Sequence, residues 1–304
     1  MPLIPLNLPA GQYRNGTEYQ SQGRWRDGNL IRWHEGALRP IGGWRQRGTV
    51  DLNGVARTMV AWEDNSNNRR VAFGTHNKLY AMTAGNTISD ITPAAFTGGR
   101  VDATAFTGYS ASTFGGGLYG LPSEDTGSIL RATTWSLENW GEYLLGCTAD
   151  DGKIYEWQLD GATPAAVLSN APTSCSSMMV TEERFVFAFG ASGDPRKVAW
   201  SDRENNNLWT PAATNEAGDI QIQTNGVILA GLRTRGQSLI LTDQDAHTAT
   251  YSGPPYVYGF ERVGTSCGLI AANAAASVDA GVMWMGQRSF FVYSGGAVQA
   301  LPCD

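Results

Sequence analysis

The segment EYLLGCTADDGKIYEWQLDGATPAAVL, residues 142–168, predicts three short strands separated by turns. Its first strand is almost wholly apolar, and its second strand carries aromatic side chains. Asp, Gly and Thr lie between the strands, and these residues favour the dihedral angles that turns require. The segment therefore predicts a small β-unit whose neighbouring strands run antiparallel.

The same plan recurs along the chain, in residues 69–91, 184–211, 237–263 and 280–301. A further apolar strand precedes three of the units, at residues 56–62, 176–180 and 226–232. Three of the four intervals between units lie near the roughly 40–50 residues of a four-stranded propeller blade. Because no single unit can bury both of its own faces, stacking of such units into a propeller explains their shortness. A β-sandwich of irregular strands is the alternative.

The predicted fold class is therefore all-β, a β-propeller-like array of short antiparallel blades with an N-terminal extended arm. No stretch shows the sustained 3.6-residue apolar period of a helix, and residues 269–277 come nearest to one. We expect an Arg- and Trp-rich arm over residues 1–55 and a propeller-like domain over 56–304. Within that domain, the Gly-, Ala- and Thr-rich residues 94–131 are either an insertion on a blade edge or a blade with a weak signature.

Charge is unevenly distributed over the 304 residues. The formal net charge is −6, yet residues 1–70 contain ten Arg and six acidic residues, whereas residues 71–304 contain twelve Lys or Arg and 22 acidic residues. A basic N-terminal part suits an acidic neighbour. The acidic remainder argues against gripping of DNA, which needs clustered cations.

The four Cys and three His form no metal-binding pattern. None of Cys147, Cys175, Cys267 and Cys303 has a zinc-type spacing, so buried free thiols are expected, with disulfides as the alternative. We expect no metal and no cofactor. The first nine residues lack the basic start of a signal peptide, and no apolar run approaches the ~18 residues of a membrane span. The protein is accordingly expected to be made in a cytosol and not to insert into a membrane.

Two short motifs bear on chemistry. TADDGKIY, residues 148–155, matches the Asp-box turn of sialidase-like propellers, in which Thr148 and Asp150 would satisfy turn amides and Gly152 would take a positive φ. That device is structural. WSDRENNNLW, residues 200–209, could offer a sugar platform beside carboxylates, or it could be a loop whose Trp side chains pack between blades. No nucleophile motif, P-loop or zinc helix occurs, so we expect no catalytic residues and no enzyme activity.

The N-terminal segment GTEYQSQGRWRDGNLIRWHEGALRPIGGWRQR, residues 16–47, alternates Arg with Trp and has no aliphatic core of its own. Arg stacks on indole rings and binds carboxylates and carbonyls, and both residue types are enriched at interface hot spots. The segment is expected to complete its burial against other blades or against another subunit. An equally weighted interpretation, compatible with the first, is that it supplies an outer strand that closes the ring of blades within its own chain.

This N-terminal segment resembles the signature of virion tail proteins of tailed bacteriophages. Residues 200–211, 239–270 and 281–304 follow the same family in order, so the chain is similar to the propeller-type tail nozzle or tail-stabilising proteins of short-tailed phages. Members of that family continue beyond the LPCD motif at residues 301–304. The resemblance therefore implies a shortened or partial chain, with residues 297–301 left as a strand without its blade.

The resemblance implies a structural virion protein in the phage tail, made in the cytoplasm of the bacterial host. It would form a homo-oligomeric ring, a hexamer, below the head-to-tail adaptor, with tail fibres as a further partner. The ring would form part of the channel through which DNA leaves without specific binding. The contact with a neighbouring subunit or the adaptor is assigned to Arg24, Trp25, Arg26, Trp33, Arg39 and Trp44. The alternatives are a carbohydrate-binding or sialidase-like propeller for host-surface recognition, and an unrelated interaction module.

Overall fold

The computed structural model describes residues 8–43, 45, 50–103, 130–279 and 281–302. Contacts divide the chain into two units, residues 1–48 and residues 49–303. The expected boundary lay after residue 55. The larger unit takes up part of that segment because the Asn53 backbone amide donates to the Tyr80 hydroxyl at 3.0 Å and the Asn77 side chain donates to that of Asn53 at 3.2 Å. The propeller-like body and the N-terminal unit are therefore considered separately.

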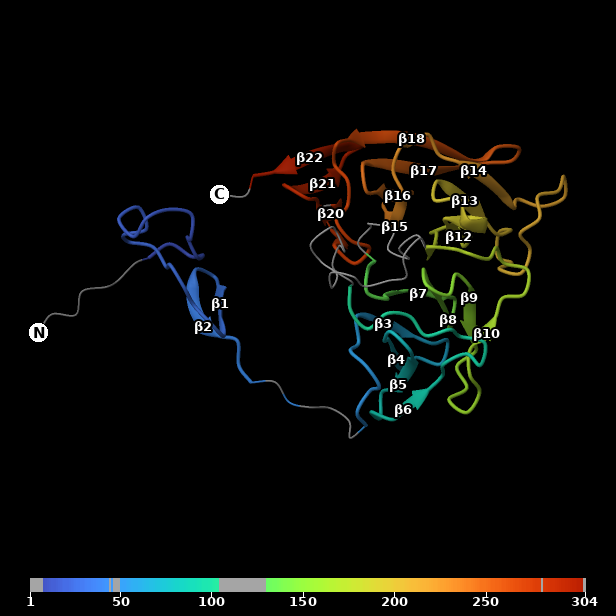
Figure 1. The fold of residues 1–304 in the computed structure, drawn as a ribbon, viewed down its shortest axis with the longest axis horizontal. Helices are drawn as coiled ribbons and strands as arrows, with labels where there is room; N and C mark the ends of the chain where they lie inside the picture. The colour runs from blue at the N-terminus through green and yellow to red at the C-terminus, as the bar shows by residue number, and fades with distance from the viewer. Residues whose placement is uncertain (1–7, 44, 46–49, 104–129, 280, 303–304) are drawn as a thin grey trace, which may run out of the picture. The chain divides into compact units, whose positions relative to one another are not determined.

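The described part of the body contains five four-stranded antiparallel sheets, which we number as blades 1 to 5 (Figure 1). Blade 1 consists of β3 (Thr58–Glu63), β4 (Arg69–Gly74), β5 (Leu79–Thr83) and β6 (Ile88–Asp90). Blade 2 consists of β7 (Trp135–Trp140), β8 (Tyr143–Thr148), β9 (Ile154–Trp157) and β10 (Ala166–Val167). Blade 3 consists of β11 (Ser177–Val180), β12 (Val186–Phe189), β13 (Lys197–Trp200) and β14 (Gly218–Gln221).

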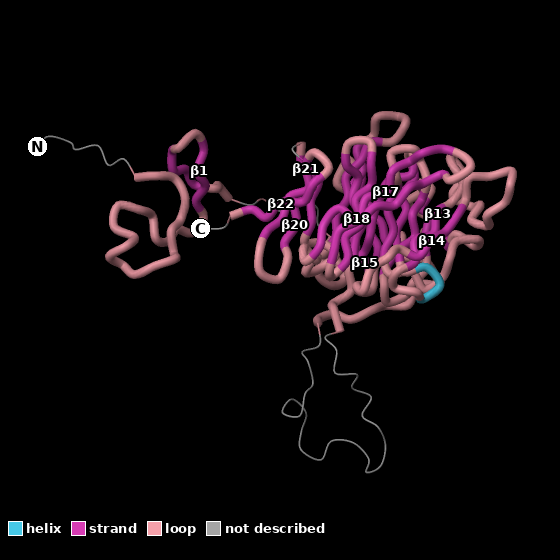
Figure 2. The backbone as a smooth tube through the Cα atoms, turned by 90° about the horizontal axis from the view of Figure 1, so that it is seen from above, coloured by secondary structure: helices cyan, strands magenta, loops and turns pink. Residues whose placement is uncertain are grey.

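The remaining two blades follow the same order. Blade 4 consists of β15 (Ile228–Thr234), β16 (Gln237–Thr242), β17 (Asp245–Gly253) and β18 (Val257–Thr265). Blade 5 consists of β19 (Ala275–Val278), β20 (Gly281–Met285), β21 (Phe290–Ser294) and β22 (Ala297–Leu301). Figure 2 shows the strands crowded together with loops at both edges and one short 3-10 turn, η1 (Ala191–Gly193). The prediction of an all-β, propeller-like array of short antiparallel blades is confirmed.

The repeated segments found in the sequence coincide with these blades. The second strands β4, β8, β12, β16 and β20 begin at or within two residues of the starts of the five repeated segments, 69–91, 142–168, 184–211, 237–263 and 280–301. The apolar segments 56–62, 176–180 and 226–232 overlap the first strands of blades 1, 3 and 4.

One expectation about the C-terminal part of the body is wrong. Residues 297–301 are not a strand without a blade, because β22 pairs with β21 along its whole length as the fourth strand of blade 5. The helix-like segment 269–277 is irregular and then enters β19, which pairs with β20. Alanine has no preference for one face, so its run there carried no strand period, although small side chains suit the crowded inner strand.

Each consecutive pair of blades shares a buried core. Four clusters join blade 1 to 2, 2 to 3, 3 to 4 and 4 to 5. The junction of blades 3 and 4 is the most aromatic: Phe187 lies 4.8 Å from Tyr258 between ring centroids and 6.2 Å from Trp200. Indole N–H groups also cross between blades, since Trp135 of blade 2 donates to the Thr75 carbonyl at 2.8 Å. Stacking of blades thus supplies the burial that one sheet cannot.

The N-terminal unit contains a two-stranded antiparallel hairpin, β1 (Ile31–His34) and β2 (Ala37–Pro40). Before it, the Tyr13 amide donates to the Trp25 carbonyl at 2.8 Å, and Arg14 forms an ion pair with Asp27. This pairing holds the pKa of Asp27 below its usual value. Among the described residues of this unit, only Ser21 is buried. The unit has local order but little core.

Some of the other sequence predictions concern described residues and can be compared with the structure, whereas others concern residues that are not described. Most of the 94–131 segment, residues 104–129, and Cys303 lie outside the described residues. Cys147, Cys175 and Cys267 are free and buried, as expected. In the described part of the chain, no helix is long and apolar enough to cross a membrane.

Candidate functional site

The first strands of the five blades surround a cavity of about 560 Å³, which we call the axial cavity. These strands adjoin one another in the order β3, β7, β11, β15 and β19. Such inner strands come from five distant parts of the sequence, so the cavity exists only in the assembled body.

An ion pair spans the axial cavity. Arg233 at the end of β15 in blade 4 donates to the carboxylate of Glu138 on β7 in blade 2. The Glu138 side chain is 24% exposed and that of Arg233 is 42% exposed. Burial raises the pKa of Glu138, and the neighbouring guanidinium opposes that rise only in part. The Ser277 hydroxyl donates to the Arg233 carbonyl at 2.9 Å, so blade 5 also holds this arginine.

The other side of the cavity has buried hydrogen-bond donors that lack a partner among the described residues. Arg57 contacts Asp102 at 3.4 Å, while its Nη1 is buried without a hydrogen-bond partner among the described residues. The hydroxyl of Ser177, a residue that is 3% exposed, likewise has no partner within the described chain. Asn273 of blade 5 donates to the Arg57 carbonyl at 3.1 Å and to the Thr58 hydroxyl at 3.2 Å. Two guanidinium groups and a free hydroxyl suit a carboxylate or phosphate oxygen.

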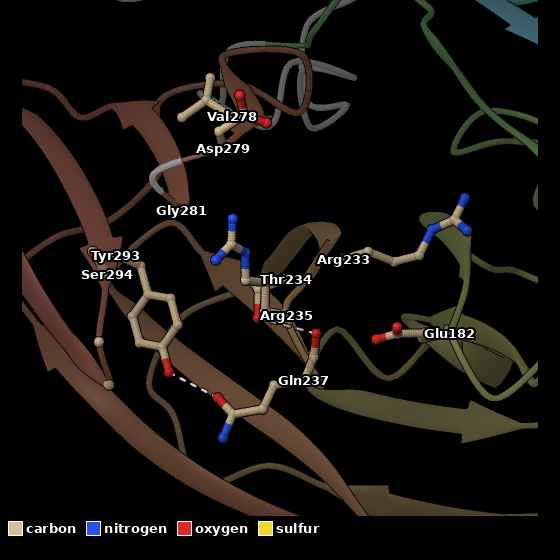
Figure 3. A pocket seen from close by; sticks show the side chains of 12 residues that line it. Glu182, Arg233, Thr234, Arg235, Gln237, Val278, Asp279, Gly281, Tyr293 and Ser294 are labelled. Carbon is tan, nitrogen blue, oxygen red and sulfur yellow. Dashed lines mark hydrogen bonds between the residues drawn. The ribbon is translucent and has the colours of Figure 1, made fainter.

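Arg233 also borders a second recess, of about 740 Å³, between blades 4 and 5 (Figure 3). There the Tyr293 hydroxyl donates to the Gln237 side chain at 2.8 Å, the dashed line between these two labelled residues in Figure 3. Glu182 lies on the opposite side and accepts from the Gly236 amide at 3.2 Å. The recess therefore has a mixed charge, and Arg233 connects it to the axial cavity.

Asp245 and His247 form a buried polar pair in blade 4. Asp245 accepts from the Thr242 hydroxyl at 2.6 Å and the Thr224 hydroxyl at 2.8 Å, and His247 Nε2 lies 3.1 Å from the same carboxylate. The Asp245 and Gln244 amides donate to the Thr242 hydroxyl, so these groups shape the turn between β16 and β17. No group of three or more potential metal ligands exists in the described residues.

The predicted turn after β8 is a related device with a different use of its aspartate. Gly152 has a φ of 70°, and its amide donates to the Thr148 carbonyl at 2.8 Å. The Thr148 hydroxyl accepts from the Asp151 amide at 3.4 Å. Asp150 does not bind turn amides, because its carboxylate accepts from Arg100 at 2.5 Å and from Thr133. This aspartate therefore ties the turn to the segment that enters blade 2.

The tryptophans of residues 200–209 offer no open sugar platform. Trp200 and Trp209 are both buried and belong to the cores on either side of blade 3. Their indole N–H groups donate to the Glu216 and Asn206 carbonyls at 2.8 and 2.7 Å. The packing alternative for this loop holds.

The predicted interface residues lie in the N-terminal unit, except for Trp44, which is outside the described residues. Arg24 is exposed and stacks over the Tyr13 ring at 5.0 Å, and Arg26 is exposed and reaches the Ser21 hydroxyl at 3.5 Å. Trp25 and Trp33 are half-buried, and Arg39 is exposed on β2. The structure thus brings these side chains into one unit, and their contact with another subunit stays a prediction.

No protein-family model and no curated protein matches the chain. Solved structures with a similar fold include virginiamycin B lyase from Staphylococcus aureus, with 10% identity over 80% of this chain and 69% of that one and a TM-score of 0.47. A catalytically inactive variant of that lyase with quinupristin has 11% identity over 88% and 74%, with a TM-score of 0.48. YCF48 bound to D1 peptide has 10% identity over 89% and 69%, with a TM-score of 0.42.

The five four-stranded sheets and the cores that they share place the described part of the body in the β-propeller-like class. These comparisons correct the expectation that the chain is not an enzyme, because the similar structures include a lyase and the fold thus gives no ground for that exclusion. At such low identity the likeness shows the fold alone, and no reaction is transferred from it.

Proposed function

We propose that the protein is a structural component of a bacteriophage tail that assembles with copies of itself into a ring, a hexamer, below the head-to-tail adaptor. The observation that carries the proposal is the pairing of a basic, poorly buried N-terminal unit with an acidic propeller body. Arg24, Arg26 and Arg39 are exposed there, and a unit with so little core needs an external surface. The family resemblance of that segment supplies the tail as the setting.

The geometry of the body supports a DNA path between copies rather than through one propeller. The axial cavity is crossed by the Glu138–Arg233 pair and holds about 560 Å³, which leaves no room for a duplex. Residues 71–304 contain 22 acidic residues against twelve Lys or Arg. A surface of that sign would let a phosphate backbone pass without binding. Localisation in the virion tail, with the adaptor and tail fibres as neighbours, belongs to the same proposal.

The proposal is tested by locating the chain in purified particles with an antibody label and electron microscopy. Labels at the tail are expected, and purified particles without the chain would refute the function. The double variant Arg24→Ala, Arg26→Ala should incorporate less than wild type, because it loses two exposed guanidinium groups. Arg69→Ala, Arg196→Ala removes the same charge from the body and serves as the matched control.

A second candidate is recognition of a surface carbohydrate, and the axial cavity is the observation in its favour. Arg57, Arg233 and the unpartnered Ser177 hydroxyl could bind the carboxylate of an acidic sugar. A glycan array with wild type and Arg233→Ala separates the two candidates. Binding that is lost in the variant would support carbohydrate recognition, and an array without signal would remove it.

A further inference from the structure

Blade 5 has one covered face and one open face. Val282 and Trp284 of β20 are buried in the core shared with blade 4. Side chains alternate along a strand, so Met283 and Met285 point to the opposite face, where they are 38% and 40% exposed. No buried core in the described residues covers them.

The open face carries a group of apolar side chains near one end of the sheet, whereas Gln299 and Ser294 lie on the same face further along. Met283 lies opposite Ala276 on β19 and Val292 on β21, and Met285 lies opposite Phe290, which in turn faces Leu301 on β22. Phe290 is 40% exposed. A hollow of about 420 Å³ is lined in part by Ala276, Met283, Met285, Phe290 and Leu301. Contiguous exposed apolar surface of this kind marks an interaction site.

The N-terminal hairpin presents a complementary apolar face. Register places Ile31 opposite Pro40 and Trp33 opposite Leu38, so these four side chains share one face of β1 and β2. Arg32, His34, Ala37 and Arg39 share the other. An isolated two-stranded hairpin is marginally stable at best, and it gains stability when a further sheet covers its apolar face.

Charge favours pairing of hairpin with body over pairing of hairpin with hairpin. Residues 1–48 contain seven Arg and three acidic residues, whereas residues 49–304 contain 15 Lys or Arg and 25 acidic residues. Two N-terminal units repel each other, and each is attracted to a body of opposite sign. Electrostatic complementarity thus selects the body as the surface that receives the hairpin.

We propose that the hairpin of one copy docks its Ile31, Trp33 and Leu38 face onto the open face of blade 5 in a second copy. The contact joins two different surfaces, so it is head-to-tail, and successive contacts generate a ring when the rotation closes. This inference rests on the proposed homo-oligomer and names the contact that builds it.

Disulfide trapping tests which copy provides the hairpin. Leu38→Cys and Met283→Cys are made in separate full-length chains that also carry Cys303→Ser, and the two are mixed with glutathione disulfide as oxidant. Each protein disulfide forms as two protein thiols are oxidised and one glutathione disulfide is reduced to two glutathione molecules. The expected product is a disulfide-linked pair of one chain of each kind. A third chain carries Leu38→Cys and Met283→Cys together. If the mixture yields no linked pair, the proposal is overturned, and a disulfide within single copies of the third chain would show that the hairpin closes its own propeller.

Sedimentation of the full chain gives an independent measure. Met283→Lys places a cation against the basic hairpin, so its self-association is expected to weaken at least about tenfold. Ile220→Lys is the matched control, because Ile220 is 39% exposed on β14, away from blade 5, and it should associate like wild type. A wild-type chain that stays monomeric at all concentrations, or equal association of all three, contradicts the inference.

The two proposals fail in distinguishable ways. If disulfide-linked pairs form but the chain is absent from purified particles, the assignment to the phage tail is wrong and the proposed contact still stands. If no disulfide-linked pairs form and the Met283→Lys variant enters particles as well as wild type, the proposed contact is wrong and the assignment to the phage tail still stands.

Discussion

The junction between blades 3 and 4 and the open face of blade 5 are built from the same kind of strand, but they have opposite surroundings. At the junction, Phe187 is fully buried and contacts rings from two blades. On the open face, Met283 and Phe290 follow the same alternation, yet about two fifths of each side chain is exposed. Alternation therefore specifies that a face is apolar, whereas the neighbouring blade decides whether that face is a core or an interaction surface.

The largest expected effect concerns the stability difference between these two surfaces. Phe187→Ala should lower the free energy of unfolding by about 3–5 kcal/mol, because it removes buried contacts and leaves a cavity. Met283→Ala should change the free energy by less than about 0.5 kcal/mol at concentrations where the chain is monomeric. Urea unfolding followed by tryptophan fluorescence measures both. Similar losses in the two variants would show that the blade 5 face is covered.

A second prediction concerns local opening next to the open face. Cys147 lies between blades 2 and 3, and Cys267 lies between blades 4 and 5. Burial raises the pKa of Cys267 to about 11 and that of Cys147 well above its usual value, so both thiols should resist alkylation at pH 8 in the folded state. In the described residues blade 5 shares a buried core with a neighbouring blade on one side only, so Cys267 should be modified roughly tenfold faster.

Alkylation with iodoacetamide in a Cys303→Ser chain, read by peptide mass spectrometry, measures that order. In urea the two thiols should react at similar rates. Faster modification of Cys147 would contradict the idea that the one-sided blade opens first.

The smallest effect concerns the axial cavity. The pKa of Glu138 is raised in the folded state, so the folded protein binds the proton more tightly than the unfolded one and loses stability as pH rises through this range. The Glu138→Gln variant has no carboxyl group at this position, so it does not lose stability in this way as the pH rises. Its urea midpoint relative to wild type should therefore be higher at pH 7 than at pH 4. A difference that is the same at both pH values would show that the ion pair with Arg233 fully offsets burial.

Much of the body could be predicted from sequence because its strands are locally encoded. The second strands of all five blades carry apolar runs bounded by turn residues, and their positions were predicted. The pair formed by Glu138 and Arg233 could not be predicted, since the two residues lie 95 positions apart and neither has a distinguishing neighbourhood. Alanine-rich β19 was missed because alanine shows no face preference.

One turn signal was present but incomplete. Thr148 and Thr242 are the last residues of β8 and β16, Thr75 directly follows β4, and all three are fully buried. The motif at residues 148–155 identified Thr148 as a turn residue. The turns at Thr75 and Thr242 lack the glycine of that motif, so the role of these two residues was not predicted from the sequence. Comparing blades by this threonine would have aligned them and indicated that Asp245 shapes a turn.

The uninterrupted order of strands within each sheet has a kinetic consequence. All pairings inside a blade join consecutive strands, so each blade can form while the ribosome is still adding the next. The hydrogen bonds from Asn273 to Arg57 and Thr58 span 216 and 215 positions. Loop closure of that length comes late, and the first and fifth blades should meet only after the four intervening junctions have formed.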